Sequence, residues 1–156
     1  MSDMNLSCDI LEMNESDRFQ IFFDKKSVFD SEIIVCMLVY NTGSEIKDAI
    51  NSIRSQETSR SVSILIIDGG ISDDWKKYID TFEDIVIVKV SEYSVSQSRN
   101  LSHQISNKVF PVAKWICRLD SDDVLHSTSS IEAISQRLDM EASEKNWAIA
   151  GNSLSE

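Results

Sequence analysis

The fold is indicated most clearly by residues 32–53, which have the sequence EIIVCMLVYNTGSEIKDAINSI. Residues Glu32 to Val39 form an apolar run rich in β-branched side chains, as expected of a strand buried on both faces. A polar segment then interrupts the run and offers Thr42 or Ser44 as a helix cap. From Ile46 onward, apolar residues recur at helical spacing with polar residues between them. The stretch therefore predicts a buried strand followed directly by an amphipathic helix.

The same alternation of strand and helix patterns continues along the chain. Further strands are predicted at Val62 to Ile67, Ile85 to Val90, Lys114 to Leu119 and Trp147 to Ala150, and helices from Ser72 or Asp73 to Phe82, from Ser94 to Asn107 and from Ser127 to Lys145. In the helix from Ser94, we expect Val95, Leu101 and Ile105 to point inward. Alternating elements of these lengths predict an α/β fold, a three-layer domain with a mostly parallel sheet. Right-handed crossovers place the loops that follow the strands along one edge of that sheet.

The first 30 residues lack this alternation. They contain one candidate strand, Phe19 to Phe23, and no pattern of helical length. We therefore divide the chain into an N-terminal extension or partly ordered leader (residues 1–30) and one α/β domain (residues 31–156). A chain of 156 residues has the size of a single domain.

Composition and charge restrict the classes of function. A net charge of −11 argues against nucleic acid as the main partner, because phosphate backbones are bound by surfaces rich in Lys and Arg. The longest apolar run, Ile33 to Tyr40, is shorter than the ~20 residues that span a bilayer, and the N-terminus lacks the regions of a signal peptide. The cysteines Cys8, Cys36 and Cys117 have neither metal-binding nor disulfide spacing. We expect a reducing, cytoplasmic location.

An acidic cluster gives the first indication of a site. The apolar run that begins at Trp115 ends abruptly in three carboxylates, Asp120, Asp122 and Asp123. Carboxylates at this density repel one another unless a cation holds them, and a hard divalent ion is the natural counter-charge. The other interpretation is a solvated acidic turn in which Asp122 or Asp123 caps the next helix. This segment alone leaves both interpretations open.

Two further loops strengthen the case for a site. Tyr40 and Asn41 follow one predicted strand, residues 68–70 (Asp-Gly-Gly) follow the next, and the acidic cluster follows a third. Because the carboxyl ends of parallel strands lie at one edge of the sheet, we expect the three loops to converge there. Ligands of open α/β sheets bind at this edge.

In this order, the loops resemble the motifs of a family 2, GT-A-type glycosyltransferase, in its N-terminal nucleotide-binding part. The matching segments are Leu38-Val-Tyr-Asn41, Asp68-Gly-Gly-Ile-Ser-Asp73, Ser98-Arg-Asn100 and Asp120-Ser-Asp-Asp123. Ser55-Gln56, at the end of the first predicted helix, also fits the family pattern. The resemblance covers about residues 32 to 152. Each motif alone is weak, whereas the ordered set of four is fairly specific.

The resemblance implies that the chain binds a nucleoside diphosphate sugar together with Mg²⁺ or Mn²⁺. The implied nucleotide-sugar residues are Leu38, Tyr40, Asn41, Asp68, Gly69, Arg99 and Asp120, and the implied metal ligands are Asp120, Asp122 and Asp123. Tyr40 would line the base pocket, Asp68 would contact the base or ribose, and Arg99 would approach the base or the phosphates. The implied reaction transfers the sugar to a hydroxyl of a saccharide or glycoconjugate acceptor, with inversion, in the cytoplasm or at the cytoplasmic face of a membrane.

The chain also departs from the family pattern. Leu38 replaces a proline, and Gly69 stands where many relatives have a second Asp, which leaves the base preference open. Family members continue beyond this chain, so that the domain is expected to be truncated at its C-terminus and the catalytic base to lie outside it. A non-catalytic nucleotide-binding or regulatory module is therefore the alternative function. A third hypothesis is a phosphoacceptor domain that uses Asp68 with Mg²⁺.

Overall fold

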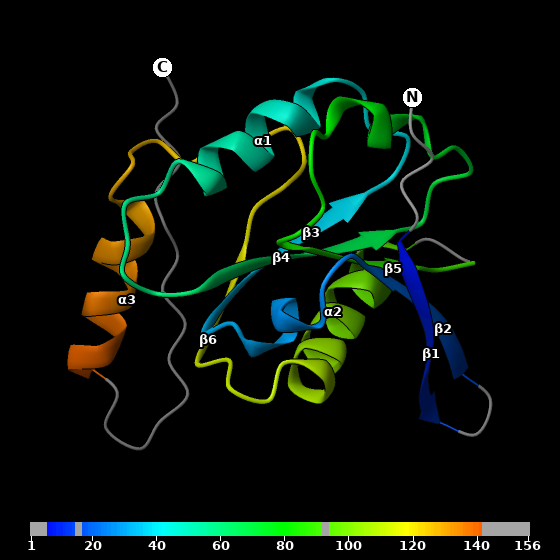
Figure 1. Cartoon of the computed structure of the whole chain (residues 1–156), viewed down its shortest axis with the longest axis horizontal. Helices are drawn as coiled ribbons and strands as arrows, with labels where there is room; N and C mark the ends of the chain where they lie inside the picture. The colour runs from blue at the N-terminus through cyan, green and yellow to red at the C-terminus, as the bar shows by residue number, and fades with distance from the viewer. Residues whose placement is uncertain (1–5, 15–16, 92–93, 142–156) are drawn as a thin grey trace.

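The computed structural model of the chain describes residues 6–14, 17–91 and 94–141. Its centre is one six-stranded sheet in the order β1-β2-β5-β4-β3-β6 (Figure 1). The strands are β1 (Ser7–Asn14), β2 (Asp17–Phe23), β3 (Ile33–Val39), β4 (Val62–Asp68), β5 (Ile85–Lys89) and β6 (Trp115–Arg118). Strands β3 to β6 run parallel to one another. The hairpin β1-β2 joins the sheet antiparallel to β5.

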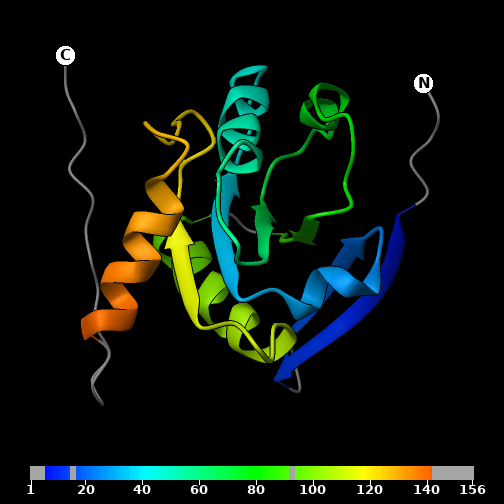
Figure 2. The same cartoon turned by 60° about the vertical axis from the view of Figure 1, so that its left-hand side comes forward.

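Helices cover both faces of the sheet, so that the predicted three-layer α/β fold is confirmed. The helices are α1 (Glu45–Arg54), α2 (Val95–Val109) and α3 (Ser130–Glu141), with two short 3₁₀ helices, η1 (Lys26–Asp30) and η2 (Asp74–Tyr78). Helices α1 and η2 lie on one face and α2 on the other (Figure 1), while α3 lies beside the edge strand β6 (Figure 2). No helix in the described ranges is both long enough and apolar enough to cross a membrane.

The buried strands fill two cores by simple alternation. On the α1 side, a cluster of buried side chains contains Ile33, Val35, Met37 and Val39 of β3. On the α2 side, a second cluster contains Ile34 and Cys36 of the same strand. Successive side chains of a strand point to opposite faces, so a run that is apolar throughout is stable only between two covering layers. This is the pattern that predicted the fold.

The N-terminal residues are more ordered than the sequence indicates. The strand at Phe19 to Phe23 is confirmed and begins earlier, at Asp17, but the preceding strand β1 was not predicted. Its pattern is obscured because Ile10 and Leu11 are adjacent, and Leu11 is buried whereas Ile10 is 64% exposed. The division at residue 31 stays a prediction, while the sheet itself continues across it through β2.

Two predicted helices differ in the structure. The helix expected to reach Phe82 is the single 3₁₀ turn of η2, after which Ile79 is extended (φ −107°, ψ 123°). The extended path lets Ile79 and Phe82 enter the core, so that packing outweighs the local helical pattern. Helix α3 begins at Ser130 rather than at Ser127, because serine hydroxyls bind the backbone N–H groups of the preceding loop. The end of the predicted helix and the strand expected at 147–150 lie outside the described residues.

Helix α2 begins as predicted, after its cap Ser94, and ends two residues later than predicted, at Val109. The Ser94 hydroxyl accepts a hydrogen bond from the backbone N–H of Gln97 (3.5 Å), as expected of an N-cap. Of the inward positions expected, Ile105 is fully buried and Leu101 is half-buried, but Val95 is 44% exposed because it lies in the first turn, at the edge of the sheet. The remaining buried positions of α2 are serines, Ser98, Ser102 and Ser106.

Candidate functional site

The loops that follow β3 and β4 lie against each other. The backbone N–H of Gly69 donates to the carbonyl of Val39 (3.0 Å). A Cβ added at Gly70 would lie 3.2 Å from the backbone nitrogen of Asn41 and 3.3 Å from Oδ1 of Asp68. The two loops can therefore approach this closely because glycine has no side chain. Asn41 has a positive φ of 51°, a conformation that asparagine adopts more readily than most residues.

The loop that follows β6 reaches the same place. The hydroxyls of Thr42 and Ser121 are 3.1 Å apart and share a hydrogen bond, which joins the first loop to the acidic loop. Within the acidic loop, the backbone N–H of Asp123 donates to the carbonyl of Asp120 (3.0 Å) and closes a turn. The predicted convergence of the three loops is therefore confirmed.

Asp68 is buried and its carboxylate is committed to protein contacts. Its side chain is inaccessible to solvent. Oδ1 accepts from the backbone N–H of Gly70 (3.0 Å), and Oδ2 accepts from the indole of Trp75 (3.2 Å) and from Nζ of Lys89 (2.9 Å). The resemblance implied a contact between Asp68 and the base or ribose, whereas these donors make Asp68 an anchor of the loop. Complete burial also argues against Asp68 as a phosphoacceptor.

Lys89 connects this anchor to the next turn of the chain. Its ammonium donates to Asp68 and also to Oδ1 of Asp73 (2.8 Å), and Asp73 forms a second ion pair with Lys76 (3.3 Å). Burial acts to lower the pKa of Lys89, but the hydrogen bonds to Asp73 and Asp68 outweigh it and raise that pKa above its ordinary value. Burial likewise acts to raise the pKa of Asp73, and Lys89 and Lys76 hold it below its ordinary value. This chain of alternating charges fixes the loop after β4 to the end of β5.

The acidic loop has the opposite character. The side chains of Asp120, Asp122 and Asp123 are all exposed. Within the part of the chain that the structure describes, no three His, Cys, Asp or Glu side chains are arranged to hold a metal ion. Mg²⁺ commonly takes only one or two carboxylates and completes its shell with substrate phosphates and water. The donor set of this loop therefore suits an ion that arrives together with a phosphorylated ligand.

The end of α1 holds the segment that follows the acidic loop. The side-chain amide of Gln56 donates to the carbonyl of Ser127 (2.6 Å), and its Oε1 accepts from the backbone N–H of Ile131 (2.9 Å), in the first turn of α3. The hydroxyl of Ser52 accepts from the backbone N–H of Leu125 (3.1 Å). The acidic loop is therefore held from both sides, by β6 and by α1.

The other predicted residues differ in their accessibility. Tyr40 is half exposed at the end of β3. Leu38 packs against the core on the α2 side, so its side chain belongs to the core beneath the loops rather than to their exposed surface. Arg99 lies in the first turns of α2 and is half-buried, and its Nε is buried with no hydrogen-bond partner among the described residues. An orphaned guanidinium nitrogen is costly unless a ligand satisfies it.

Large apolar side chains are also exposed around these loops. Tyr40, Ile71, Val95 and Val124 belong to the loop after β3, the loop after β4, the start of α2 and the acidic loop. Exposed apolar groups that gather at one edge, beside charged groups, are typical of a surface that a ligand or another segment covers.

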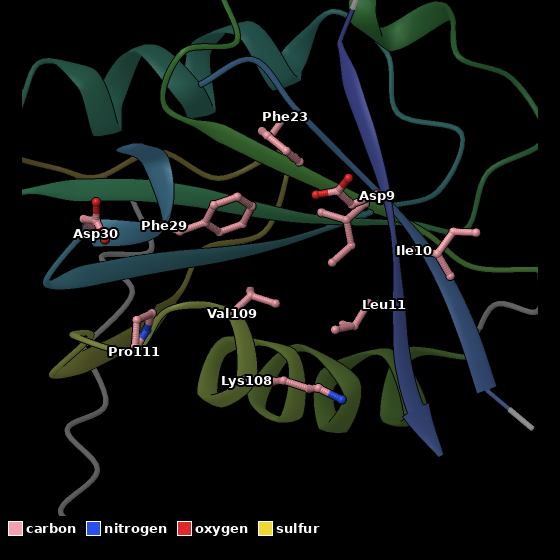
Figure 3. A pocket seen from close by; sticks show the side chains of 10 residues that line it. Asp9, Ile10, Leu11, Phe23, Phe29, Asp30, Lys108, Val109 and Pro111 are labelled. Atoms are coloured by element: carbon pink, nitrogen blue, oxygen red, sulfur yellow. The ribbon is translucent and has the colours of Figure 1, made fainter. Parts of the chain in front are cut away.

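A separate cavity lies away from this edge. Its volume is about 430 Å³, and it is lined by residues of the β1-β2 hairpin, η1 and the end of α2. Figure 3 shows Leu11 of the hairpin facing Val109 of α2 across it, with Phe29 at one side and Lys108 at the mouth. None of the predicted site residues lines this cavity, because α2 begins at the edge of the loops and ends beside the cavity.

These loops and this sheet define a member of glycosyl transferase family 2, and the chain belongs to that family. The family model, described as glycosyl transferase family 2, matches residues 34–143. The match covers β3 to α3 and contains all of the predicted site residues. The resemblance noted from the motifs is thus confirmed.

Solved structures support the fold. The crystal structure of S. aureus TarS 1–349 is similar with a TM-score of 0.57 at 15% identity, over 80% of this chain and 38% of that chain. A second crystal structure of S. aureus TarS gives a TM-score of 0.54 at 13% identity, over 70% of this chain and 20% of that chain. The chain therefore has a fold of the GT-A type and spans well under half of these proteins. A comparison with curated protein sequences gives no match.

Two residues that shape the site, Lys89 and Gln56, are not identifiable from local sequence patterns. Lys89 is the last residue of a strand, and its partners are 16 and 21 residues away in the sequence. Gln56 was noted only as a match to the family pattern. Its contacts with the loop before α3 span 71 and 75 residues, which no periodicity reveals.

Proposed function

We propose that the edge formed by the three loops binds a nucleoside diphosphate sugar with Mg²⁺ or Mn²⁺, and that the chain contributes this site to glycosyl transfer. The observation that carries the proposal is the convergence of the Tyr40-Asn41, Gly69-Gly70 and Asp120–Asp123 loops in a domain of family 2. Ligands of open α/β sheets bind at this edge.

The nucleotide would lie against the loops after β3 and β4. The ring of Tyr40, which is half exposed, provides an apolar surface for the base. Asn41 and Gly69 lie next to it and offer backbone groups without bulky side chains. The Asp68 carboxylate is occupied by Trp75, Lys89 and Gly70, so its role in binding is to hold this surface in shape.

The metal would be held by one or two carboxylates of the acidic loop, drawn from Asp120, Asp122 and Asp123, with Asp120 also near the ribose. When bound, such an ion would supply positive charge that stabilises the negative charge developing on the leaving nucleoside diphosphate. The exposed loop carries three negative charges, and these also raise the local concentration of divalent cations.

The proposed reaction is an inverting transfer to a hydroxyl of a saccharide or glycoconjugate. The acceptor oxygen attacks the anomeric carbon, the bond from that carbon to the diphosphate oxygen breaks, and the hydroxyl proton passes to a general base. We assign no described residue as that base. A cytoplasmic site, free or at a membrane surface, is part of the same proposal.

The test is calorimetric titration of UDP and of GDP into the protein, with and without Mn²⁺. We expect one of the two to bind, and to bind at least ten times more tightly with Mn²⁺. The nucleotide that binds more tightly indicates the donor class. Binding that does not depend on Mn²⁺ would favour the non-catalytic nucleotide-binding module, and no binding of either nucleotide would contradict the donor assignment.

A further inference from the structure

Two arginines near the site have side chains with no hydrogen-bond or ion-pair partner among the described residues. The chain has six arginines and a net charge of −11, so carboxylate partners are abundant. Arg18, Arg54 and Arg60 form ion pairs with carboxylates, and Arg137 also has a partner. The side chains of Arg99 and Arg118, in contrast, form no hydrogen bond or ion pair within residues 6–14, 17–91 and 94–141. Arg99 is itself a predicted site residue, and Arg118 precedes the predicted site residue Asp120 by two positions.

Arg118 lies on the α2 side of the sheet. It is the exposed last residue of β6 and is opposite Cys36 of β3. Along β6, Ile116 packs into the α2-side core, whereas Cys117 and Leu119 pack on the α1 side. Alternation therefore places Arg118, and Asp120 two residues later, on the α2 side.

The surroundings of Cys36 support this placement. Burial raises the pKa of the Cys36 thiol, and hydrogen bonds with Ser106 and Ser102 and the positive charge of Arg118 oppose that rise.

Arg99 lies on the side of α2 that faces the same strands. It precedes Ser106 by seven residues, or two helical turns, which places both on one side of the helix. The hydroxyl of Ser106 is 3.7 Å from Sγ of Cys36. Because α2 begins at the edge of the loops, Arg99 lies about 10 Å nearer to that edge than Ser106 does. Helix α2 packs against β3 and β4.

We propose that Arg118 and Arg99 together bind the diphosphate of the donor from the α2 side of the edge. The inference rests on the proposed function, and it adds Arg118, which none of the matching motifs includes. A guanidinium binds two phosphate oxygens with parallel hydrogen bonds, and a diphosphate offers several such oxygens. One anion would satisfy the buried Nε of Arg99, which has no partner among the described residues, and would pair with the charge of Arg118.

This arrangement divides the binding of the diphosphate between two kinds of group. Carboxylates of the acidic loop act through the metal, whereas the arginines contact phosphate oxygens directly. The arginine contribution is therefore independent of Mn²⁺, and it weakens at high salt because Arg118 is exposed.

The experiment compares the full chain with Arg118→Gln, Arg118→Lys and Lys47→Gln. The probes are UDP, GDP, uridine and inorganic pyrophosphate, titrated calorimetrically with and without Mn²⁺. Lys47→Gln is the matched control, because Lys47 is an exposed cation in the first turn of α1, at the same edge but on the other face. Thermal melting checks that each variant folds.

We expect Arg118→Gln to weaken the binding of pyrophosphate and of the preferred nucleotide by about 10- to 100-fold, since a hydrogen bond to a charged group is lost. Arg118→Lys should recover only part of the loss, because lysine lacks the planar fork. Uridine binding and the Lys47→Gln variant should change less than about twofold, which corresponds to a few tenths of a kcal/mol.

The outcomes separate the two proposals. Unchanged UDP or GDP affinity in a folded Arg118→Gln variant would overturn the role of Arg118 and leave the donor assignment intact. Arg118-dependent binding of pyrophosphate without binding of either nucleotide would support the anion site and overturn the donor assignment. If the wild-type chain bound neither nucleotides nor pyrophosphate, both would be overturned.

Discussion

Asp68 and Asp122 are the same residue type, follow strands on either side of β3, and belong to two motifs of one family, yet their surroundings are opposite. Asp68 is fully buried and accepts three hydrogen bonds from protein donors. Asp122 is exposed in a loop with two other carboxylates. The carboxylate of Asp68 has exchanged its hydration for protein hydrogen bonds, whereas the oxygen atoms of Asp122 remain accessible to a ligand. The comparison teaches that a strand-end Asp in a motif can stabilise the site or bind at it.

Substitution of the buried Asp68 should have the largest effect on the stability of the protein. Asp68→Ala leaves the buried indole N–H of Trp75 and the backbone N–H of Gly70 without their acceptor, and leaves the ammonium of Lys89 with Asp73 alone. We expect the free energy of unfolding to fall by about 3–5 kcal/mol, the range for breaking a buried charged pair. Urea denaturation followed by tryptophan fluorescence measures this loss. A loss below about 1 kcal/mol would show that Asp68 does not anchor the loop.

The exposed member should give the reverse result. Asp122→Ala removes a charged oxygen ligand from the surface, so stability should change by no more than about 0.5 kcal/mol. The same substitution should abolish the metal-dependent part of nucleotide binding, measured by titration of UDP and GDP with and without Mn²⁺. Asp9→Ala, which removes an exposed carboxylate from the distant hairpin, is the control. Unchanged Mn²⁺-dependent affinity in a folded Asp122→Ala variant would refute the metal-site assignment.

The sequence predicts the parallel part of the fold well, for a physical reason. Strand β3 is apolar at nearly every position because helices cover both of its faces, and this leaves a clear composition signal. Strand β1 is at the edge of the sheet and has one face in solvent and the other against α2, with Ile10 exposed and Leu11 buried. Such a strand is defined by its partner β2 rather than by its own pattern.

The convergence of the three loops is also predictable, because strand order and right-handed crossovers bring the loops to one edge. The roles of the individual carboxylates within these loops are not predictable from the sequence. Whether a carboxylate is satisfied depends on side chains that arrive from elsewhere, such as Trp75, seven residues after Asp68, and Lys89, 21 residues after it. The motif Asp-Gly-Gly contains no information about either donor, and the resemblance, which implies a ligand contact for Asp68, does not reveal them.

Asp73 is intermediate between the buried Asp68 and the exposed Asp122, and its substitution should have the smallest effect on stability. Its side chain is 55% exposed and pairs with Lys89 and Lys76. Burial acts to raise its pKa, but the two lysines hold that pKa below the ordinary value of 3.8.

A carboxyl whose pKa is lower in the folded state stabilises the fold above its unfolded pKa, and this contribution disappears as the pH falls through the folded value. Wild type should therefore lose stability relative to Asp73→Asn as the pH falls below about 4. Because the pair is exposed, we expect the difference to be less than about 1 kcal/mol, measured by urea denaturation at a series of pH values. Parallel curves for the two proteins through this pH range would show that the lysines do not stabilise the Asp73 carboxylate, and that its charge, like that of Asp122, remains in solvent.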